Sequence, residues 1–109
     1  MELSKHCIPC ENDTQPINGP EIQKYILELQ PEWNVIDSKK LSRDFPFEGY
    51  SNTIDFVNKV ATLAQQEGHH PVMHVFFTKV NIELWTHFVN GLTDNDFIMA
   101  AKIDEIYKS

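Results

Sequence analysis

Cysteine is scarce in this sequence: Cys7 and Cys10 are its only two, and they lie in one short stretch near the start. Two cysteines so close together cannot supply the disulfide framework of a small secreted domain. No apolar run approaches the roughly 20 residues that span a bilayer. The first ten residues, MELSKHCIPC, also lack the apolar segment of a signal peptide. We therefore expect a cytoplasmic protein with reduced thiols and no membrane association.

Positive charge is also in short supply, with 9 Lys and Arg against 16 Asp and Glu and a formal net charge of −7. Such a surface repels the phosphate backbone of nucleic acids and the anionic face of a membrane. Neither is therefore expected as a partner. The length of 109 residues and a hydrophobic content of 41% are typical of one globular domain.

Residues 1–18 show no hydrophobic periodicity, and we interpret them as a flexible tail that precedes a domain of residues 19–109. The tail contains a CxxC motif, formed by Cys7 and Cys10, which could bind zinc or act in redox chemistry. One such motif supplies only two ligands, and no thioredoxin-like βαβ pattern surrounds it. We expect these thiols to be inert.

Hydrophobic periodicity within the domain predicts three helices and four strands. Apolar residues at helical spacing predict helices over about 20–29 and 51–67, the second capped by Ser51, Asn52 or Thr53. The stretch TDND at 93–96 resembles a capping box, which opens a last helix. Strands are predicted by β-prone or alternating apolar residues at 33–37, 41–47, 72–77 and 80–87.

The resulting order is α-β-β-α-β-β-α, and short links between the strands of each pair favour antiparallel pairing. We therefore predict an α+β domain with a four-stranded antiparallel sheet and helices packed on one face. The apolar residues of helix 51–67 cover about half of its circumference, whereas facing one core needs only roughly 100°. The excess indicates a second buried surface, such as a contact with another subunit.

Three of the five histidines lie in the stretch EGHHPVMH, residues 67–74. Pro71 keeps His70 out of helical geometry, so the pair His69 and His70 falls between the long helix and a strand. If the following two strands form a hairpin, His87 returns to the same end of the sheet. The residues alone leave three interpretations open: partly exposed strand-end histidines, a zinc site with an open position for water, and metal-free acid/base catalysis.

The string GHHPVMHVFFTKVNIELWTHFVNGLTDNDFIMAAKID, residues 68–104, resembles the signature of the pterin-4a-carbinolamine dehydratase family. That signature combines HHP, a TH near the end of a strand pair, GLT-x-x-D and A-x-x-I. Upstream, FPFEGY at 45–50 is similar to another of the family's motifs. The resemblance covers about residues 20 to 106, nearly the whole predicted domain.

The resemblance implies a lyase that dehydrates the 4a-hydroxytetrahydropterin left by aromatic amino acid hydroxylases, giving quinonoid dihydropterin for tetrahydrobiopterin recycling. It implies no cofactor and no metal, a pterin as substrate, a functional link to such a hydroxylase, and a homo-oligomer, either a dimer or a tetramer. Mapped onto this chain, His69 and His87 become the acid/base pair and His70 positions the pterin. Asp96 either orients a histidine or caps the last helix.

Three neighbouring residues carry weaker expectations. His74 matches no signature position and is expected to be a strand residue, while Trp85 is expected to serve packing or an interface more than the pterin. Gln65 occupies a position where family members often carry glutamate, although Glu67 is close by.

The alternative function is a non-catalytic dimerisation or coactivator module on the same fold, because an animal member of the family also binds a homeodomain transcription factor. A pure binding module would have no need to keep His69, His70 and His87 together.

Overall fold

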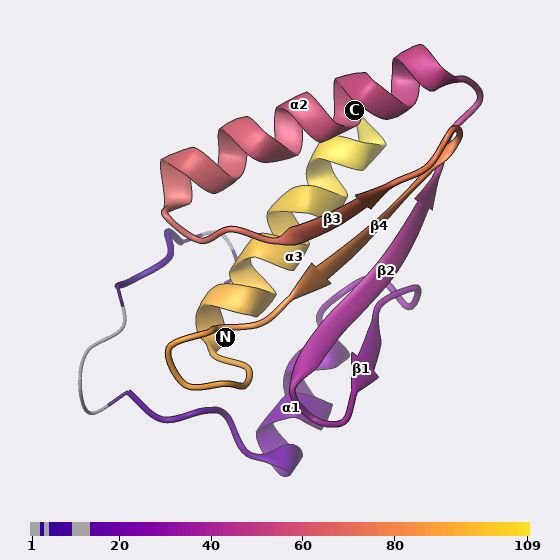
Figure 1. The fold of residues 1–109 in the computed structure, drawn as a ribbon. Coiled ribbons are helices and arrows are strands. Elements are labelled where there is room, and N and C mark those ends of the chain that lie inside the picture. Colours follow the sequence, from indigo (N-terminus) through magenta and orange to yellow (C-terminus); the bar gives the residue numbers. More distant parts are fainter. Residues whose placement is uncertain (1–2, 4, 10–13) are drawn as a thin grey trace.

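The computed structural model describes residues 3, 5–9 and 14–109. These residues form the predicted order of elements, α-β-β-α-β-β-α (Figure 1). The helices are α1 (Gly19–Ile26), α2 (Tyr50–Glu67) and α3 (Asp94–Lys108). The strands are β1 (Asn34–Ile36), β2 (Lys40–Pro46), β3 (Val72–Val75) and β4 (Lys79–Leu84). The predicted α+β class is confirmed. In the part of the chain that the structure describes, no helix is long and apolar enough to cross a membrane.

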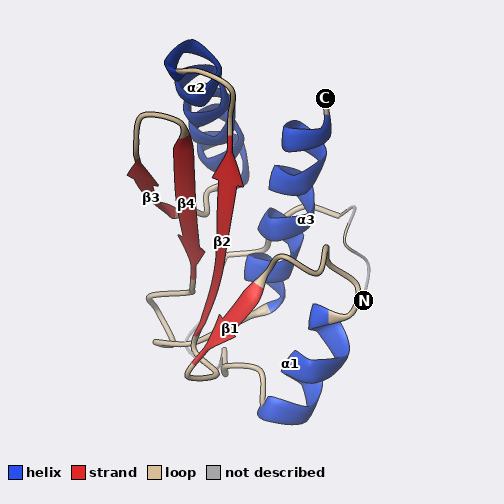
Figure 2. Ribbon diagram, turned by 90° about the vertical axis from the view of Figure 1, so that its right-hand side faces the viewer, coloured by secondary structure: helices blue, strands red, loops and turns tan. Residues whose placement is uncertain are grey.

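The four strands form one antiparallel sheet in the order β1-β2-β4-β3. Side chains alternate between its two faces, so each pair of opposed residues in the two central strands shares a face. The buried pairs are Leu41 with Leu84, Arg43 with Ile82, and Phe45 with Val80. All three helices cover the face to which these residues point (Figure 2), as predicted.

The core lies between that sheet face and the helices. Phe45 of β2 packs against Phe56 of α2 and Tyr107 of α3, with ring centroids 4.9 Å and 5.0 Å apart. Helix α2 buries Phe56, Val60 and Ala64, whereas the remaining residues of the predicted apolar arc are less covered. Of these, which we name the outer apolar residues of α2, Ile54, Val57 and Leu63 are half-buried and Ala61 is exposed.

Helix α1 ends at Ile26, about one turn earlier than predicted. Leu29 lies in the following turn, yet its side chain is buried in the core. Because the turn returns Leu29 to the core, Leu29 has the same sequence spacing from Ile22 as a buried helical residue, and the helix was predicted too long for this reason. The predicted cap of α2 was also wrong, because Gly49 occupies the N-cap and the hydroxyl of Thr53 instead bonds to the carbonyl of Gly49 at 2.9 Å.

Both strands of the second hairpin are shorter than predicted. β3 ends at Val75, and the exposed Phe76 and Phe77 lie in the turn that leads to β4. β4 ends at Leu84, after which Thr86 forms an isolated bridge with Gly91. His87 therefore lies in a loop, beyond the last residue of β4.

The described residues before α1 contact the domain at several points. Leu3, Cys7 and Ile17 pack against the core, and the amide of Ile17 donates to the carbonyl of Leu92 at 2.8 Å. The predicted boundary between a flexible tail and the domain at residue 18 stays a prediction. Cys10 lies outside the described residues, so the structure describes only Cys7 of the CxxC motif.

Candidate active site

The end of α2 positions the first two histidines. Gly68 has φ 67°, a left-handed conformation that favours glycine, and its amide still bonds to the carbonyl of Ala64 at 2.9 Å. The helix therefore stops there, and His69 and His70 emerge before β3 begins at Val72.

The antiparallel pairing of β3 and β4 brings His87 back to the same end of the sheet. His69, His70 and His87 line one cleft of about 440 Å³. Trp85 and Phe88 contribute aromatic surface to the same walls. The predicted convergence of the two histidine sites is thus confirmed.

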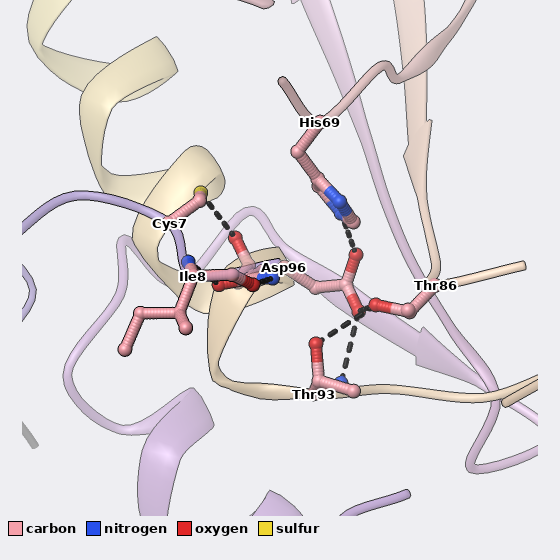
Figure 3. A network of polar contacts seen from close by, with 7 residues as sticks. Cys7, Ile8, His69, Thr86, Thr93 and Asp96 are labelled. Carbon is pink, nitrogen blue, oxygen red and sulfur yellow. Dashed lines mark hydrogen bonds and ion pairs between the residues drawn. The ribbon is translucent and has the colours of Figure 1, made fainter. Parts of the chain in front are cut away.

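His69 is held by Asp96 from the first turn of α3, and Figure 3 shows the contact. Its Nε2 lies 2.6 Å from Oδ1 of Asp96, whose carboxyl group is completely buried. The other oxygen, Oδ2, accepts from the hydroxyl of Thr86 at 2.8 Å and from the amide of Thr93 at 3.0 Å. The carboxylate therefore caps α3 with one oxygen and orients His69 with the other, so both roles expected for it are present in the geometry.

This network fixes the tautomer of His69. A carboxylate can only accept hydrogen bonds, so Nε2 of His69 carries the proton that points at Oδ1. Nδ1 is left as the nitrogen that can take up or release a proton. No hydrogen bond to Nδ1 is made within the described residues.

His70 and His87 are held less tightly. Nε2 of His70 lies 3.3 Å from Oε1 of Gln65, so this side chain offers the ring a neutral oxygen and no charge. The exposed ring of His87 packs on Trp85, with centroids 4.4 Å apart, and Lys40 Nζ lies 4.4 Å from the centroid of the Trp85 ring. Among the described residues, His87 makes no side-chain hydrogen bond.

His74 lies outside the cleft. It is a residue of β3, as expected, and its Nε2 lies 3.1 Å from Oε1 of Glu83 on the neighbouring strand. Within residues 3, 5–9 and 14–109, no three His, Cys, Asp or Glu side chains are grouped so that they could hold a metal ion. Burial, followed by the nearby charge of Glu67, raises the pKa of the Cys7 thiol to about 12. Cys7 is therefore a protonated thiol at neutral pH, without the thiolate that metal binding or redox attack requires.

The sequence analysis gave no role to four residues that lie near the histidines: Pro9, Glu67, Thr86 and Asn95. Thr86 had a local signal, because alternation along β4 places it on the buried face next to His87. Glu67 and Asn95 act through hydrogen bonds to residues at least 60 positions away, and Pro9 lines the cleft from the N-terminal segment, so no local sequence pattern indicates these three.

A larger hollow of about 660 Å³ lies between the end of β2, α2 and the end of α3. Its walls include Phe47, Lys59 and Tyr107 but no histidine, and its two carboxylates, Glu48 and Asp55, are exposed. It lacks the buried polar groups that hold a reacting molecule, so the histidine cleft is the better candidate.

Comparison with known proteins shows to which family the sequence is similar. A family model described as pterin 4 alpha carbinolamine dehydratase matches residues 15–106. A relative from Rickettsia canadensis is 46% identical over 100 residues, which is 92% of each chain. Another from Chlorobaculum tepidum is 40% identical over 106 residues, which is 94% of this chain and 95% of the relative. Both are provisionally named pterin-4-alpha-carbinolamine dehydratases.

Two solved structures share the fold. A transcriptional coactivator/pterin dehydratase from Brucella melitensis superposes with a TM-score of 0.80 at 28% identity, over 85% of this chain and 99% of that one. A pterin dehydratase-like protein, identified as a RuBisCO assembly factor of the α-carboxysome, gives a TM-score of 0.63 at 28% identity. That match covers 72% of this chain and 92% of the other.

Proposed function

The chain belongs to the pterin 4 alpha carbinolamine dehydratase family, as the sequence signature predicted, and from this premise we propose that it dehydrates a 4a-hydroxytetrahydropterin. One observation carries the proposal. His69, His70 and His87 line a single cleft, and a buried carboxylate orients the first of them.

The reaction needs two proton transfers and no change of oxidation state at the protein. The bond between C4a and the hydroxyl oxygen breaks, and that oxygen leaves as water after it receives a proton. N5 loses its proton, and the electron pair forms the C4a–N5 double bond of quinonoid dihydropterin. Imidazoles suit both transfers, because they can donate or accept near neutral pH.

We assign the two transfers to His69 and His87. The buried carboxylate of Asp96 lies 2.6 Å from Nε2 of His69 and orients the ring. Nδ1 of His69 is the nitrogen left to exchange the proton. His87 lies in the loop after β4, whereas His69 lies between α2 and β3, so the two rings reach the cleft from different segments.

His70 is proposed to bind the substrate. A flat pterin presents ring nitrogens and a carbonyl along its edge, and an imidazole can hydrogen-bond to such an edge. The cleft volume of about 440 Å³ falls within the range of small-molecule sites. Trp85 and Phe88 line the same cleft and offer aromatic surface against which a flat ring can pack.

The test is a kinetic assay with freshly generated 4a-hydroxytetrahydropterin, in which ultraviolet absorbance follows dehydration above the spontaneous rate. His69→Ala and His87→Ala should each lower kcat by about 10²–10⁴-fold, equivalent to about 3–5 kcal/mol. His70→Ala should raise KM more than it lowers kcat. His74→Ala is the matched control, since this histidine lies outside the cleft, and should change either constant by less than about twofold.

Circular dichroism must first show that each variant is folded. If His69→Ala and His87→Ala fold normally and keep wild-type kcat, the catalytic assignment is wrong.

A second candidate function is a binding module without catalysis. The outer apolar residues of α2 favour it, and one structural relative is described as a RuBisCO assembly factor. The same assay decides between the two, because a pure binding module would leave the spontaneous dehydration rate unchanged.

A further inference from the structure

Residues 6–9, which we name the N-terminal strap, lie against the ends of two helices that also hold the candidate site. Figure 3 shows Cys7 and Ile8 beside the first turn of α3, near Asp96. The sequence predicted no role for this segment, yet it makes hydrogen bonds to both α2 and α3.

Glu67, the last residue of α2, anchors the first half of the strap. Its side chain is only 4% exposed. Oε1 accepts from the amide of Cys7 at 2.8 Å, and Oε2 lies 2.7 Å from Nδ1 of His6. Lys102 of α3 donates to the same Oε2 at 3.0 Å. Burial favours the protonated acid, but these donors outweigh it and hold the pKa of Glu67 at about 2. At neutral pH the anchor is therefore a buried, fully charged carboxylate.

Asn95, in the first turn of α3, anchors the second half. Its Oδ1 accepts from the amide of Ile8 at 2.9 Å, and its Nδ2 donates to the carbonyl of Ile8 at 2.7 Å. This reciprocal pair satisfies both backbone groups of one strap residue, as a strand partner would. The Cys7 thiol adds a weak contact to the carbonyl of Asn95 at 3.7 Å.

The two anchors adjoin the catalytic machinery proposed above. Glu67 precedes His69 by two residues, and Asn95 immediately precedes Asp96, which orients His69. Beyond them, Pro9 of the strap lines the histidine cleft together with His87. Proline has no amide proton and no charge, so it gives that wall an apolar surface that does not compete for the protons being transferred.

We propose that the N-terminal strap is a wall of the substrate cleft, and that Glu67 and Asn95 are positioning residues that hold this wall against the bound pterin. The inference rests on the proposed dehydratase function. The wall confines a flat heterocycle next to His69 and His87 and reduces the access of water from that side. It contributes mainly to substrate binding, since none of the strap side chains takes part in the proton transfers.

Attachment of the strap is tested without reference to activity. Hydrogen exchange at the amides of Cys7 and Ile8, and alkylation of Cys7 resolved by peptide mass spectrometry, should be slow in the wild type. Glu67→Ala should accelerate both by at least about tenfold, because a hydrogen bond to a charged group is worth about 1.5–3 kcal/mol. Asp55→Ala, at an exposed carboxylate of the same helix that makes no side-chain hydrogen bond or ion pair with described residues, should match the wild type.

Two further variants keep the test informative if Glu67→Ala unfolds. Glu67→Gln keeps an oxygen acceptor for the Cys7 amide and should give a smaller acceleration than Glu67→Ala. His6→Ala removes a side chain that is 85% exposed, so the core stays intact, and exchange at Cys7 should rise by about two- to threefold.

The role as a wall is tested by kinetics on the same proteins with 4a-hydroxytetrahydropterin as the probe. Glu67→Ala should raise KM by at least about fivefold and lower kcat by less than about threefold, with Glu67→Gln between it and the wild type. If Glu67→Ala left hydrogen exchange at Cys7 and Ile8 unchanged, Glu67 would not anchor the strap. If exchange became faster but KM did not change, the strap would not be a wall of the substrate cleft. A wild-type protein with a protected strap but no dehydration would instead overturn the proposed function.

Discussion

Acidification should weaken the folded protein through Glu67. The pKa of this carboxyl group is about 2 in the folded chain, against an ordinary value of 4.5. Burial alone would raise it, but the Cys7 amide, the His6 ring and Lys102 more than compensate. Because the folded state binds a proton less readily than the unfolded state, the ionised carboxylate stabilises folding. This contribution is complete well above pH 4.5 and disappears as the pH falls through 2.

The magnitude follows from the two pKa values. Since one pKa unit corresponds to 1.36 kcal/mol, a fall from 4.5 to about 2 gives a contribution of about 3 kcal/mol at neutral pH. Integration of the proton linkage leaves about 3 kcal/mol at pH 5 and about 1 kcal/mol at pH 3. Domains of this kind have a total stability of roughly 5–15 kcal/mol, so a loss of about 2 kcal/mol is readily measured.

Urea unfolding of the wild type and of Glu67→Gln between pH 5 and pH 3 tests this value. Imidazoles ordinarily titrate near pH 6.5, so mainly carboxyl groups change charge in that window. The stability difference between the two proteins should shrink by about 2 kcal/mol over the window. Asp55→Asn, at an exposed position of the same helix, should differ from the wild type by less than about 0.5 kcal/mol throughout. A wild-type advantage over Glu67→Gln that did not change with pH would refute the reasoning.

Three further outcomes are expected. Dialysis against a strong chelator should leave dehydration unchanged, and a loss of activity that added zinc restored would revive the metal hypothesis. Sedimentation should give a mass at least twice 12.7 kDa, because the outer apolar residues of α2 are only partly covered within one chain, whereas a monomer at micromolar concentration would contradict self-association. Asp96→Asn replaces one carboxylate oxygen by an amide donor, which would face either His69 or the Thr93 amide. We expect a lower kcat and a loss of about 1–3 kcal/mol of stability in urea unfolding. If Asp96→Asn kept the wild-type kcat, the Asp96 carboxylate would have no part in the reaction.

The fold was predictable because its elements are specified locally. The alternation in β2 and β4 reflects a sheet with one covered face, and TDND at 93–96 marks the start of α3 in both the sequence and the structure. The meeting of His69 with His87 was predictable for a related reason, since a tight hairpin returns the chain to the end at which it started.

Contacts between distant segments were not predictable. Cys7 and Glu67 are 60 residues apart, and nothing in the composition of residues 1–18 indicates that the Cys7 amide bonds to a buried carboxylate. Leu29 shows the complementary error, because a leucine that a turn returns to the core has the same spacing as one on a helix. Periodicity records which residues are buried, but it does not record which backbone path buries them.

The two proposed acid/base histidines differ in how far they are tied to the fold, and this difference decides which variant is the cleaner test. Asp96 contacts His69 with one carboxylate oxygen and caps α3 with the other. Replacement of His69 therefore leaves the completely buried carboxylate of Asp96 without one of its hydrogen-bond donors. We expect His69→Ala to lose about 1–3 kcal/mol of stability together with its kcat. His87 is exposed and makes only a ring contact with Trp85 among the described residues, so His87→Ala should unfold within about 0.5 kcal/mol of the wild type. A large loss of kcat in His87→Ala with unchanged urea unfolding would therefore isolate chemistry from structure. If His87→Ala instead lost as much stability as His69→Ala, its kinetic defect would say nothing about proton transfer.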